Sequence, residues 1–330
     1  MELLNDPTRL DAESITLLAQ YYDLKEHWGP RIAAEGIAAH RLFASAVFAR
    51  FRGAEHDVAP ARVVELQIDA PGGPRRARLY HPPGQPPFPT VLFLHGGGWS
   101  VGGVEDYDGL AGSLAGLSRV AVLSLDYRLA PEHRFPAALE DAVAALQFLE
   151  RHGPDVGCDP GRLGAMGDSA GGNLAAVVAR EAALGRAPQL VAQFLLYPMT
   201  DIASPDEHFA SRRDYGDGRF FLANAAIAFA RENYVAPGGA RHDDPRVSPL
   251  LGPVPPTLAP AFILSASHDP LRDEAHAYHE HLMRAGVPSI DCSVAPALHA
   301  FLSFGVLASA QRVRRIVASA LNELMERRID

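Results

Sequence analysis

The spacing of apolar residues changes early in the chain. Residues 11–50 carry apolar side chains at helical spacing and predict two amphipathic helices, with the break expected near Gly29-Pro30. Residues 63–68 and 77–80 then alternate between apolar and polar positions around the turn Pro71-Gly72-Gly73-Pro74, which is typical of an antiparallel hairpin at a sheet edge. Because both helices precede every strand signal, we expect them to form a cap on the core that follows.

From residue 90 onward, short and mostly apolar runs alternate with helical patterns. The nearly continuous apolar runs at 91–94 and 120–125 are typical of parallel strands buried on both faces. Further strands are predicted at 162–166, 193–196, 261–264 and 290–294. Helical patterns lie at 136–151, 170–184, 274–285 and 311–327. The alternation predicts an α/β fold with a mostly parallel, doubly wound sheet flanked by helices.

One long segment does not follow this alternation. Residues 197–247 contain turn residues and a helical pattern at 222–234, but no buried strand. We expect this segment to join the first two helices over the sheet. The predicted organisation is therefore a cap of residues 1–50 and a core of residues 51–330, with a cap insertion at about 200–245.

Charge and hydropathy restrict the class of partner. The 330 residues include 30 basic and 39 acidic side chains, and the resulting net charge of −9 disfavours nucleic acid and anionic membrane surfaces as partners. No stretch approaches the ~18 consecutive apolar residues of a membrane helix. The first residues also lack the pattern of a signal peptide. We therefore expect a cytoplasmic protein that does not bind membranes.

Cysteine and histidine spacing argues against a metal site. The two cysteines, Cys158 and Cys292, lie far apart and outside any metal-ligand motif, so we expect two reduced thiols. Three histidines, His276, His279 and His281, fall on one predicted helix, but their offsets do not place all three on one face. No metal is predicted.

A glycine-rich segment, Gly167-Asp168-Ser169-Ala170-Gly171-Gly172, lies between a predicted strand and a predicted helix. This is the context of a GxSxG nucleophile elbow, where a serine occupies a sharp turn between small neighbours. A strand–helix turn without any chemistry has the same local pattern. Ser169 is therefore a candidate nucleophile only if a base and an oxyanion-binding loop accompany it.

A second glycine tract, His95-Gly96-Gly97-Gly98-Trp99, follows the apolar run at 91–94. Consecutive glycines leave their backbone N–H groups unobstructed, as an oxyanion hole requires. A phosphate-binding loop is the alternative, but the tract contains neither GK[ST] nor GxGxxG. We therefore favour oxyanion binding, with His95 orienting the loop.

Candidates for the acid and the base follow two later strands. Asp269 and His299 each come just after a predicted strand, where the sites of α/β sheets form. The order serine, acid, histidine is also that of hydrolases with a nucleophile elbow. Asp273 is an alternative acid but fits a helix cap better, and His268 lies too close to Asp269 to serve as its base.

Together these motifs resemble the hormone-sensitive-lipase-like group of microbial carboxylesterases. The resemblance covers roughly residues 90–305 and rests on HGGGW, GDSAGG, the block Asp126–His133 (DYRLAPEH), the acid block DPLRDE and the late histidine. It implies an α/β-hydrolase fold with a helical cap, and a serine esterase with the triad Ser169, Asp269 and His299. It further implies an oxyanion hole from the amides of Gly97, Gly98 and Ala170, with Gly96 adjacent, and no metal or organic cofactor.

The resemblance also implies hydrolysis of short-to-medium-chain acyl esters through an acyl-enzyme. Trp99 and Phe301 flank the glycine tract and the base and are candidate walls of an apolar acyl pocket, with a place in the core as the alternative. For Phe220, Phe221 and Phe229 in the insertion, the pocket wall and the core are equal alternatives. An amidase or peptidase with the same triad is an alternative function. A non-enzymatic small-ligand receptor is a second alternative, although such a protein would be expected to lack the base. The expected partner is a small-molecule ester, and a homodimer could pair through the edge strand at 290–294.

Overall fold

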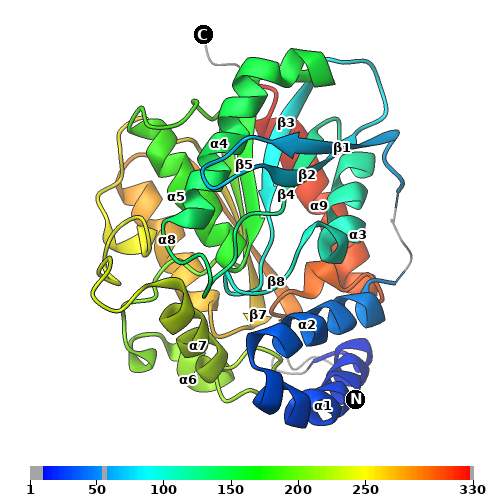
Figure 1. Ribbon diagram of the computed structural model, residues 1–330, viewed down its shortest axis with the longest axis vertical. Helices are drawn as coiled ribbons and strands as arrows, with labels where there is room; N and C mark the ends of the chain where they lie inside the picture. Colours follow the sequence, from blue (N-terminus) through cyan, green and yellow to red (C-terminus); the bar gives the residue numbers. More distant parts are fainter. Residues whose placement is uncertain (1–9, 54–57, 328–330) are drawn as a thin grey trace, which may run out of the picture.

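The computed structural model describes residues 10–53 and 58–327 (Figure 1). An eight-stranded sheet has the order β1-β2-β4-β3-β5-β6-β7-β8. Its strands are Arg62–Ile68 (β1), Arg75–His81 (β2), Phe88–Leu94 (β3), Ala121–Leu125 (β4), Cys158–Asp168 (β5), Ala192–Leu196 (β6), Ala261–His268 (β7) and Ser289–Leu298 (β8). β2 pairs antiparallel with β1 and β4, and the other neighbours pair in parallel. The predicted edge hairpin and mostly parallel sheet are confirmed.

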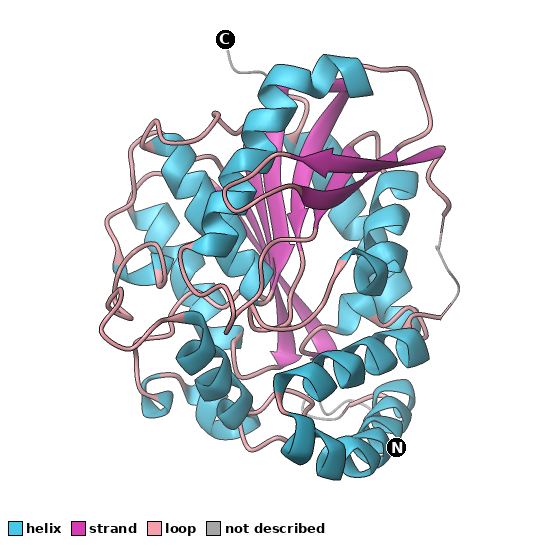
Figure 2. Ribbon diagram, in the orientation of Figure 1, coloured by secondary structure: helices cyan, strands magenta, loops and turns pink. Residues whose placement is uncertain are grey.

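Helices cover both faces of the twisted sheet (Figure 2). On one face lie α4 (Ala137–His152), α5 (Ala170–Ala183) and α8 (Arg272–Arg284), and on the other lie α3 (Val104–Leu117) and α9 (Ala308–Leu324). Along β3, Leu92 and Leu94 face the first layer, whereas Val91 and Phe93 face the second. Since all four side chains are fully buried, a continuous apolar run replaces the alternation of a one-sided strand.

The first two helices are α1 (Ala12–Glu35) and α2 (Ile37–Phe51), and they break at Gly36. The expected break near Gly29-Pro30 is therefore wrong. Gly36 has φ +62°, a left-handed conformation that glycine adopts readily. Pro30 lies inside α1, where it and Glu26, whose carbonyl loses its helical donor, are both exposed, so water can replace the missing hydrogen bond.

The inserted segment contains α6 (Ala210–Tyr215) and α7 (Asn224–Tyr234). These helices lie with α1 and α2 at the end of the molecule to which the parallel strands point (Figure 1). The Tyr21 and Phe221 rings have centroids 4.6 Å apart, and those of His40 and Phe229 are 5.6 Å apart. The two segments are thus in contact, although the division of the chain into cap and core stays a prediction.

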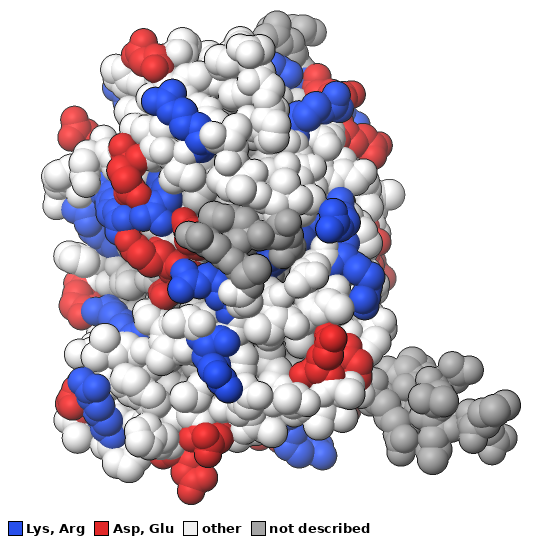
Figure 3. All heavy atoms as spheres, turned by 90° about the vertical axis from the view of Figure 1, so that its right-hand side faces the viewer, with Lys and Arg blue, Asp and Glu red and all other residues white. Residues whose placement is uncertain are grey.

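Short 3-10 turns complete the described elements, at Gly153–Val156, Asp206–His208, Pro249–Leu251 and Phe301–Ser303. On the face shown in Figure 3, basic and acidic side chains are interspersed, and neither sign forms a continuous patch. Within residues 10–53 and 58–327, the helices are all too short or too polar to cross a bilayer.

Candidate active site

Ser169, Asp269 and His299 directly follow the last residues of β5, β7 and β8. The carboxyl ends of parallel strands meet at one edge of the sheet, so residues distant in sequence converge there. His299 Nε2 lies 2.9 Å from Ser169 Oγ, and His299 Nδ1 lies 2.7 Å from Asp269 Oδ2. All three side chains are buried. The structure therefore brings the predicted nucleophile, base and acid into one chain of hydrogen bonds.

The turn that carries Ser169 depends on two glycines. Ser169 has φ +55° and ψ −119°, a conformation that is strained for any residue with a Cβ. A Cβ at Gly171 would lie 1.9 Å from the Leu94 carbonyl oxygen, and one at Gly167 would lie 2.2 Å from the Gly171 oxygen. Strand and helix can therefore meet at this angle only because both positions are glycine.

The glycine tract reaches the nucleophile through the order of the strands. β3 has β4 on one side and β5 on the other, so the chain order reverses there, and the loops after β3 and β5 face one crevice. Asp168 joins these loops, because its Oδ1 accepts the N–H of Gly96 at 2.7 Å and its Oδ2 accepts the Tyr107 hydroxyl at 3.2 Å. The Gly96 amide is thus already engaged and is not available to an oxyanion, so Gly96 lies beside the candidate oxyanion-binding amides and does not contribute one.

The amides of Gly97, Gly98 and Ala170 are differently placed. Gly97 and Gly98 line the same cavity as Ser169, and no acceptor for their N–H groups is found in the described part of the chain. Ala170 is the first residue of α5, where a backbone N–H has no partner within the helix. These three amides are therefore available to a developing oxyanion.

His95 holds the start of the glycine tract. Its ring stacks on Tyr127 with centroids 4.3 Å apart, and the Tyr127 hydroxyl donates to the His95 carbonyl at 2.7 Å. His95 Nδ1 lies 2.8 Å from the Gly96 carbonyl oxygen. Burial lowers the pKa of His95, which favours the neutral ring. These contacts agree with an orienting role.

A cavity of about 460 Å³ is lined in part by Ser169 and His299, the candidate nucleophile and base. Its wall is mostly apolar, and much of it comes from two parts of the chain: Phe43 and Phe48 belong to α2, and Ile227 and Phe229 belong to α7. The volume and lining are typical of a small-molecule site. The N-terminal helices and the insertion therefore cover Ser169 and His299 together.

Trp99 and Phe301 do not line this cavity, and the prediction that they do is wrong. Trp99 has φ +56° and is fully buried, and its ring stacks on that of Tyr234 with centroids 4.1 Å apart. Phe301 is also fully buried and packs near the ring of Tyr197, with centroids 6.0 Å apart. Both are core residues. Of Phe220, Phe221 and Phe229, the cavity wall contains Phe221 and Phe229 but not Phe220.

The alternative acid and base have other contacts. Asp273 lies in the first turn of α8 and accepts the N–H of Ser211 at 2.8 Å, so it ties α6 to α8 and is not the N-cap of its own helix. His268 Nδ1 lies 2.8 Å from Ser267 Oγ. Neither residue contacts Ser169.

The three histidines of α8 have separate partners: His276 lies 2.6 Å from Asp291, His279 lies 3.0 Å from Ser289, and His281 lies 2.8 Å from the Gly252 carbonyl oxygen. Within the described ranges, no group of three or more His, Cys, Asp or Glu side chains could hold a metal ion. Both cysteines are free thiols.

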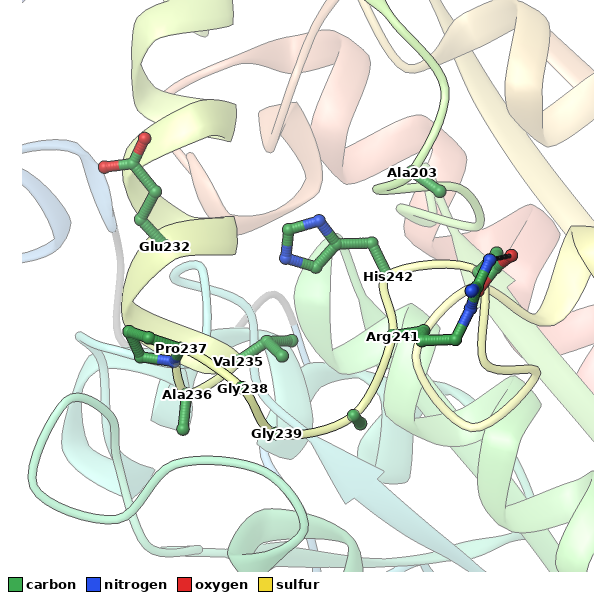
Figure 4. A pocket seen from close by; sticks show the side chains of 11 residues that line it. Ala203, Glu232, Val235, Ala236, Pro237, Gly238, Gly239, Arg241 and His242 are labelled. Atoms are coloured by element: carbon green, nitrogen blue, oxygen red, sulfur yellow. Dashed lines mark hydrogen bonds and ion pairs between the residues drawn. The ribbon is translucent and has the colours of Figure 1, made fainter.

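A larger hollow of about 770 Å³ is formed by residues 235–243 with Ala203 and Glu232 (Figure 4). The His242 ring projects into it, while Arg241 is paired with Asp243 at 2.7 Å. Since neither the nucleophile nor the base lines this hollow, its size alone does not make it the site.

Two polar residues of the site have no role in the sequence analysis. Asp168 lies inside the GDSAGG motif, and an acid at the end of a buried strand is a signal that could have revealed it. Burial raises its pKa to about 7. Tyr107 lies on α3, a helix that the apolar pattern does not predict, so no comparable signal exists for it.

Comparisons with known proteins agree with this geometry. Residues 91–303 match the family described as alpha/beta hydrolase fold. The chain is 39% identical over 269 residues to the carboxylic ester hydrolase LipN of Mycobacterium tuberculosis. This match covers 80% of this chain and 69% of that protein. It is 38% identical over 254 residues to an ethyl acetate hydrolase of Pseudomonas putida, covering 74% of this chain and 77% of that protein.

Solved structures show the same likeness. An alpha/beta hydrolase enzyme from the metagenome of Lake Arreo, Spain, has a TM-score of 0.87 at 31% identity, covering 96% of this chain and 99% of that chain. An esterase of Pyrobaculum calidifontis has a TM-score of 0.82 at 31% identity, and the match covers 93% of this chain and 98% of that chain. The chain thus belongs to the alpha/beta hydrolase family, in its hormone-sensitive-lipase-like group of carboxylic ester hydrolases.

Proposed function

We propose that this protein hydrolyses short-to-medium-chain carboxylic esters by a serine mechanism with an acyl-enzyme intermediate. The observation that carries the proposal is the chain of hydrogen bonds from Ser169 through His299 to Asp269, at 2.9 and 2.7 Å, beside free glycine amides. The names of its relatives, which include carboxylic ester hydrolases and esterases, support the reaction class.

In the acylation half, Ser169 Oγ attacks the ester carbonyl carbon while His299 Nε2 takes the hydroxyl proton. The Asp269 carboxylate accepts from Nδ1–H and so fixes the tautomer that leaves Nε2 free to act as the base. Negative charge develops on the former carbonyl oxygen, which the amides of Gly97, Gly98 and Ala170 stabilise. When the tetrahedral species collapses, His299 returns the proton to the leaving oxygen, and the alcohol departs.

In the deacylation half, water enters and His299 Nε2 takes its proton as the oxygen attacks the acyl carbon. The bond from this carbon to Ser169 Oγ then breaks, and the proton on His299 returns to the serine. The carboxylic acid leaves and the free enzyme is restored. These steps use only residues of this chain and one water molecule.

The cavity supports the substrate class. Its mostly apolar wall suits an acyl chain, and about 460 Å³ lies toward the lower end of the ~300–1,000 Å³ range of small-molecule pockets. We infer a small-molecule ester as the partner. A homodimer and a cytoplasmic location stay predictions.

The test is hydrolysis of p-nitrophenyl esters from acetate to hexadecanoate by the wild type and by Ser169→Ala. We expect an optimum at short to medium chains, and a loss of about 10⁴-fold or more in kcat for the variant. Ser124→Ala is the matched control, because Ser124 is a buried serine of β4 outside the cavity. Retained turnover in Ser169→Ala would refute the mechanism, and a long-chain optimum would refute the substrate class.

An amide substrate separates the esterase from an amidase with the same triad. We expect the p-nitrophenyl ester of a given acyl group to be cleaved much faster than the corresponding p-nitroanilide. Comparable values of kcat/KM for the two compounds would favour the amidase instead.

A further inference from the structure

Arg41 on α2 contacts two other segments of the protein at once. Its Nε donates to the Ser100 carbonyl at 2.9 Å, and its Nη2 donates to the Ala130 carbonyl at 3.1 Å. Both terminal nitrogens also bind the Glu132 carboxylate, at 2.9 and 2.6 Å. One guanidinium therefore joins the N-terminal helices to the loop after β3 and to the segment after β4.

The loop end of this contact belongs to the oxyanion-binding turn. The N–H groups of Ser100 and Val101 both donate to the Gly97 carbonyl, at 3.1 and 3.0 Å. These two bonds close the turn that presents the Gly97 and Gly98 amides. A shift of Ser100 would therefore rotate the peptide units on which the proposed oxyanion hole depends.

The helix end of the contact belongs to the cavity wall. His40 and Ala44, on the same helix as Arg41, both line the cavity over Ser169. Other polar contacts of α1 and α2 involve different segments: Ser45 donates to Asp106 at 3.2 Å, and the Tyr22 hydroxyl donates to the Gly218 carbonyl. The contact of Arg41 leads directly to the turn beside the nucleophile.

The exposure of the Arg41–Glu132 ion pair indicates a role in positioning, not in the global stability of the protein. The Arg41 and Glu132 side chains are 31% and 48% exposed, and exposed ion pairs add little to global stability. The planar guanidinium nevertheless fixes direction, because it binds a carboxylate with two nitrogens and still reaches two carbonyl groups. The hydrogen bonds to Arg41 lower the pKa of Glu132, as expected for an ionised partner.

We propose that Arg41 is a positioning residue that couples the seating of α2 to the orientation of the Gly97 and Gly98 amides. In this role it acts on the transition state through Ser100 and touches no reacting atom. Glu132 orients the guanidinium. The inference rests on the proposed ester hydrolysis, and it adds that the helix over the cavity helps to set the oxyanion geometry.

The test compares ligands that do and do not use the oxyanion hole. A phenylboronic acid forms a bond from boron to Ser169 Oγ, the serine proton passes to His299, and nothing leaves. A boronate oxygen then occupies the oxyanion position. The ether analogue of a good substrate, with CH₂ in place of the carbonyl, fills the cavity without making that contact.

For Arg41→Met, we expect kcat for p-nitrophenyl butyrate to fall and the boronate Kd to rise, each by about tenfold. That is less than the ~10²–10³-fold effect of removing a whole oxyanion donor. The Kd of the ether should change by less than about threefold, because uniform binding does not depend on the amides. Arg41→Lys and Glu132→Gln should give smaller changes in the same direction.

Arg31→Met is the matched control, since Arg31 pairs with Glu35 at 2.9 Å within α1. It should leave both Kd values and kcat unchanged. If Arg41→Met fails to fold, as judged by circular dichroism and thermal unfolding, Arg41→Lys and Glu132→Gln support the same comparison. Equal loss of boronate and ether binding, or no loss of either, would overturn the inference. A wild type without esterase activity would instead refute the proposed function.

Discussion

Asp168 Oδ1 accepts the N–H of Gly96 at 2.7 Å, although 72 positions separate the two residues in the chain. This bond joins the residue before the proposed nucleophile to the loop that presents the proposed oxyanion-binding amides. The elbow and the loop are therefore one polar unit, and a change at Asp168 affects both. The acid is fully buried, which makes its protonation state a property of the fold.

The pH dependence of stability tests this burial. Because burial raises the pKa of Asp168 from 3.8 to about 7, the folded state binds one more proton than the unfolded state between those values. The contribution of Asp168 to the free energy of unfolding is complete below about pH 4 and is lost as the pH rises through about 7. Asp168→Asn removes this titration.

We therefore expect the wild type to lose more stability between pH 4 and pH 8 than Asp168→Asn does, by on the order of 2–4 kcal/mol. Urea unfolding at several pH values measures the difference. Parallel curves for the two proteins would show that folding does not raise the pKa of Asp168.

The strained backbone of Ser169 predicts a difference in stability between two variants that both remove the hydroxyl. Ser169→Ala and Ser169→Gly both lose the hydroxyl, but only glycine accepts φ +55° and ψ −119° without strain. We expect Ser169→Gly to be more stable than Ser169→Ala by about 1 kcal/mol in chemical denaturation. Equal stability of the two variants would mean that the turn relaxes when the hydroxyl is removed.

The cavity wall predicts how the acyl preference responds to volume. Ala44 lines the cavity from α2, so Ala44→Phe should shorten the preferred acyl chain in a p-nitrophenyl ester series. Ala38→Phe is the control, because Ala38 is an exposed residue of the same helix outside the wall. An unchanged optimum in Ala44→Phe would show that the acyl group binds elsewhere.

Alanine substitutions at Trp99 and Phe229 should have opposite effects on stability and on substrate preference. Trp99 is buried against Tyr234 and lies outside the wall, so Trp99→Ala should destabilise the protein by about 3–5 kcal/mol while leaving the acyl-chain optimum in place. Phe229 lines the wall and is 41% exposed, so Phe229→Ala should raise KM for the longer esters at nearly unchanged stability. A shifted optimum in Trp99→Ala would return Trp99 to the substrate site.

Local patterns were sufficient for the core of the sheet and for the order of the chemical groups. Strands buried on both faces need continuous apolar runs, so each internal strand is visible in the sequence. A nucleophile elbow needs small residues around the serine, so Gly167 and Gly171 mark its position. Residues placed just after strands must converge at one edge of a parallel sheet, which is why Asp269 and His299 could be identified before the contacts of His299 with Asp269 and Ser169 were known.

Other features depended on which surfaces pack together. α3 has no clear signal because Gly109, Gly112 and Gly116 lower its helix propensity, whereas burial against α9 and the sheet stabilises it. At Gly116 a Cβ would lie 2.2 Å from the Val58 carbonyl oxygen, so glycine is required by a neighbour distant in sequence. Propensity is a local quantity, and tertiary packing outweighs it here.

Side-chain direction and amide use were also decided by the tertiary structure. All three glycines of the tract look equivalent in sequence, but Gly96 donates to Asp168 and only Gly97 and Gly98 face the cavity. Trp99 follows them directly, yet a left-handed backbone turns its ring toward α7. Sequence alone thus determined which residues reach the edge of the sheet, because strand burial and turn sterics are local. The direction in which each group points was settled only by contacts between distant segments.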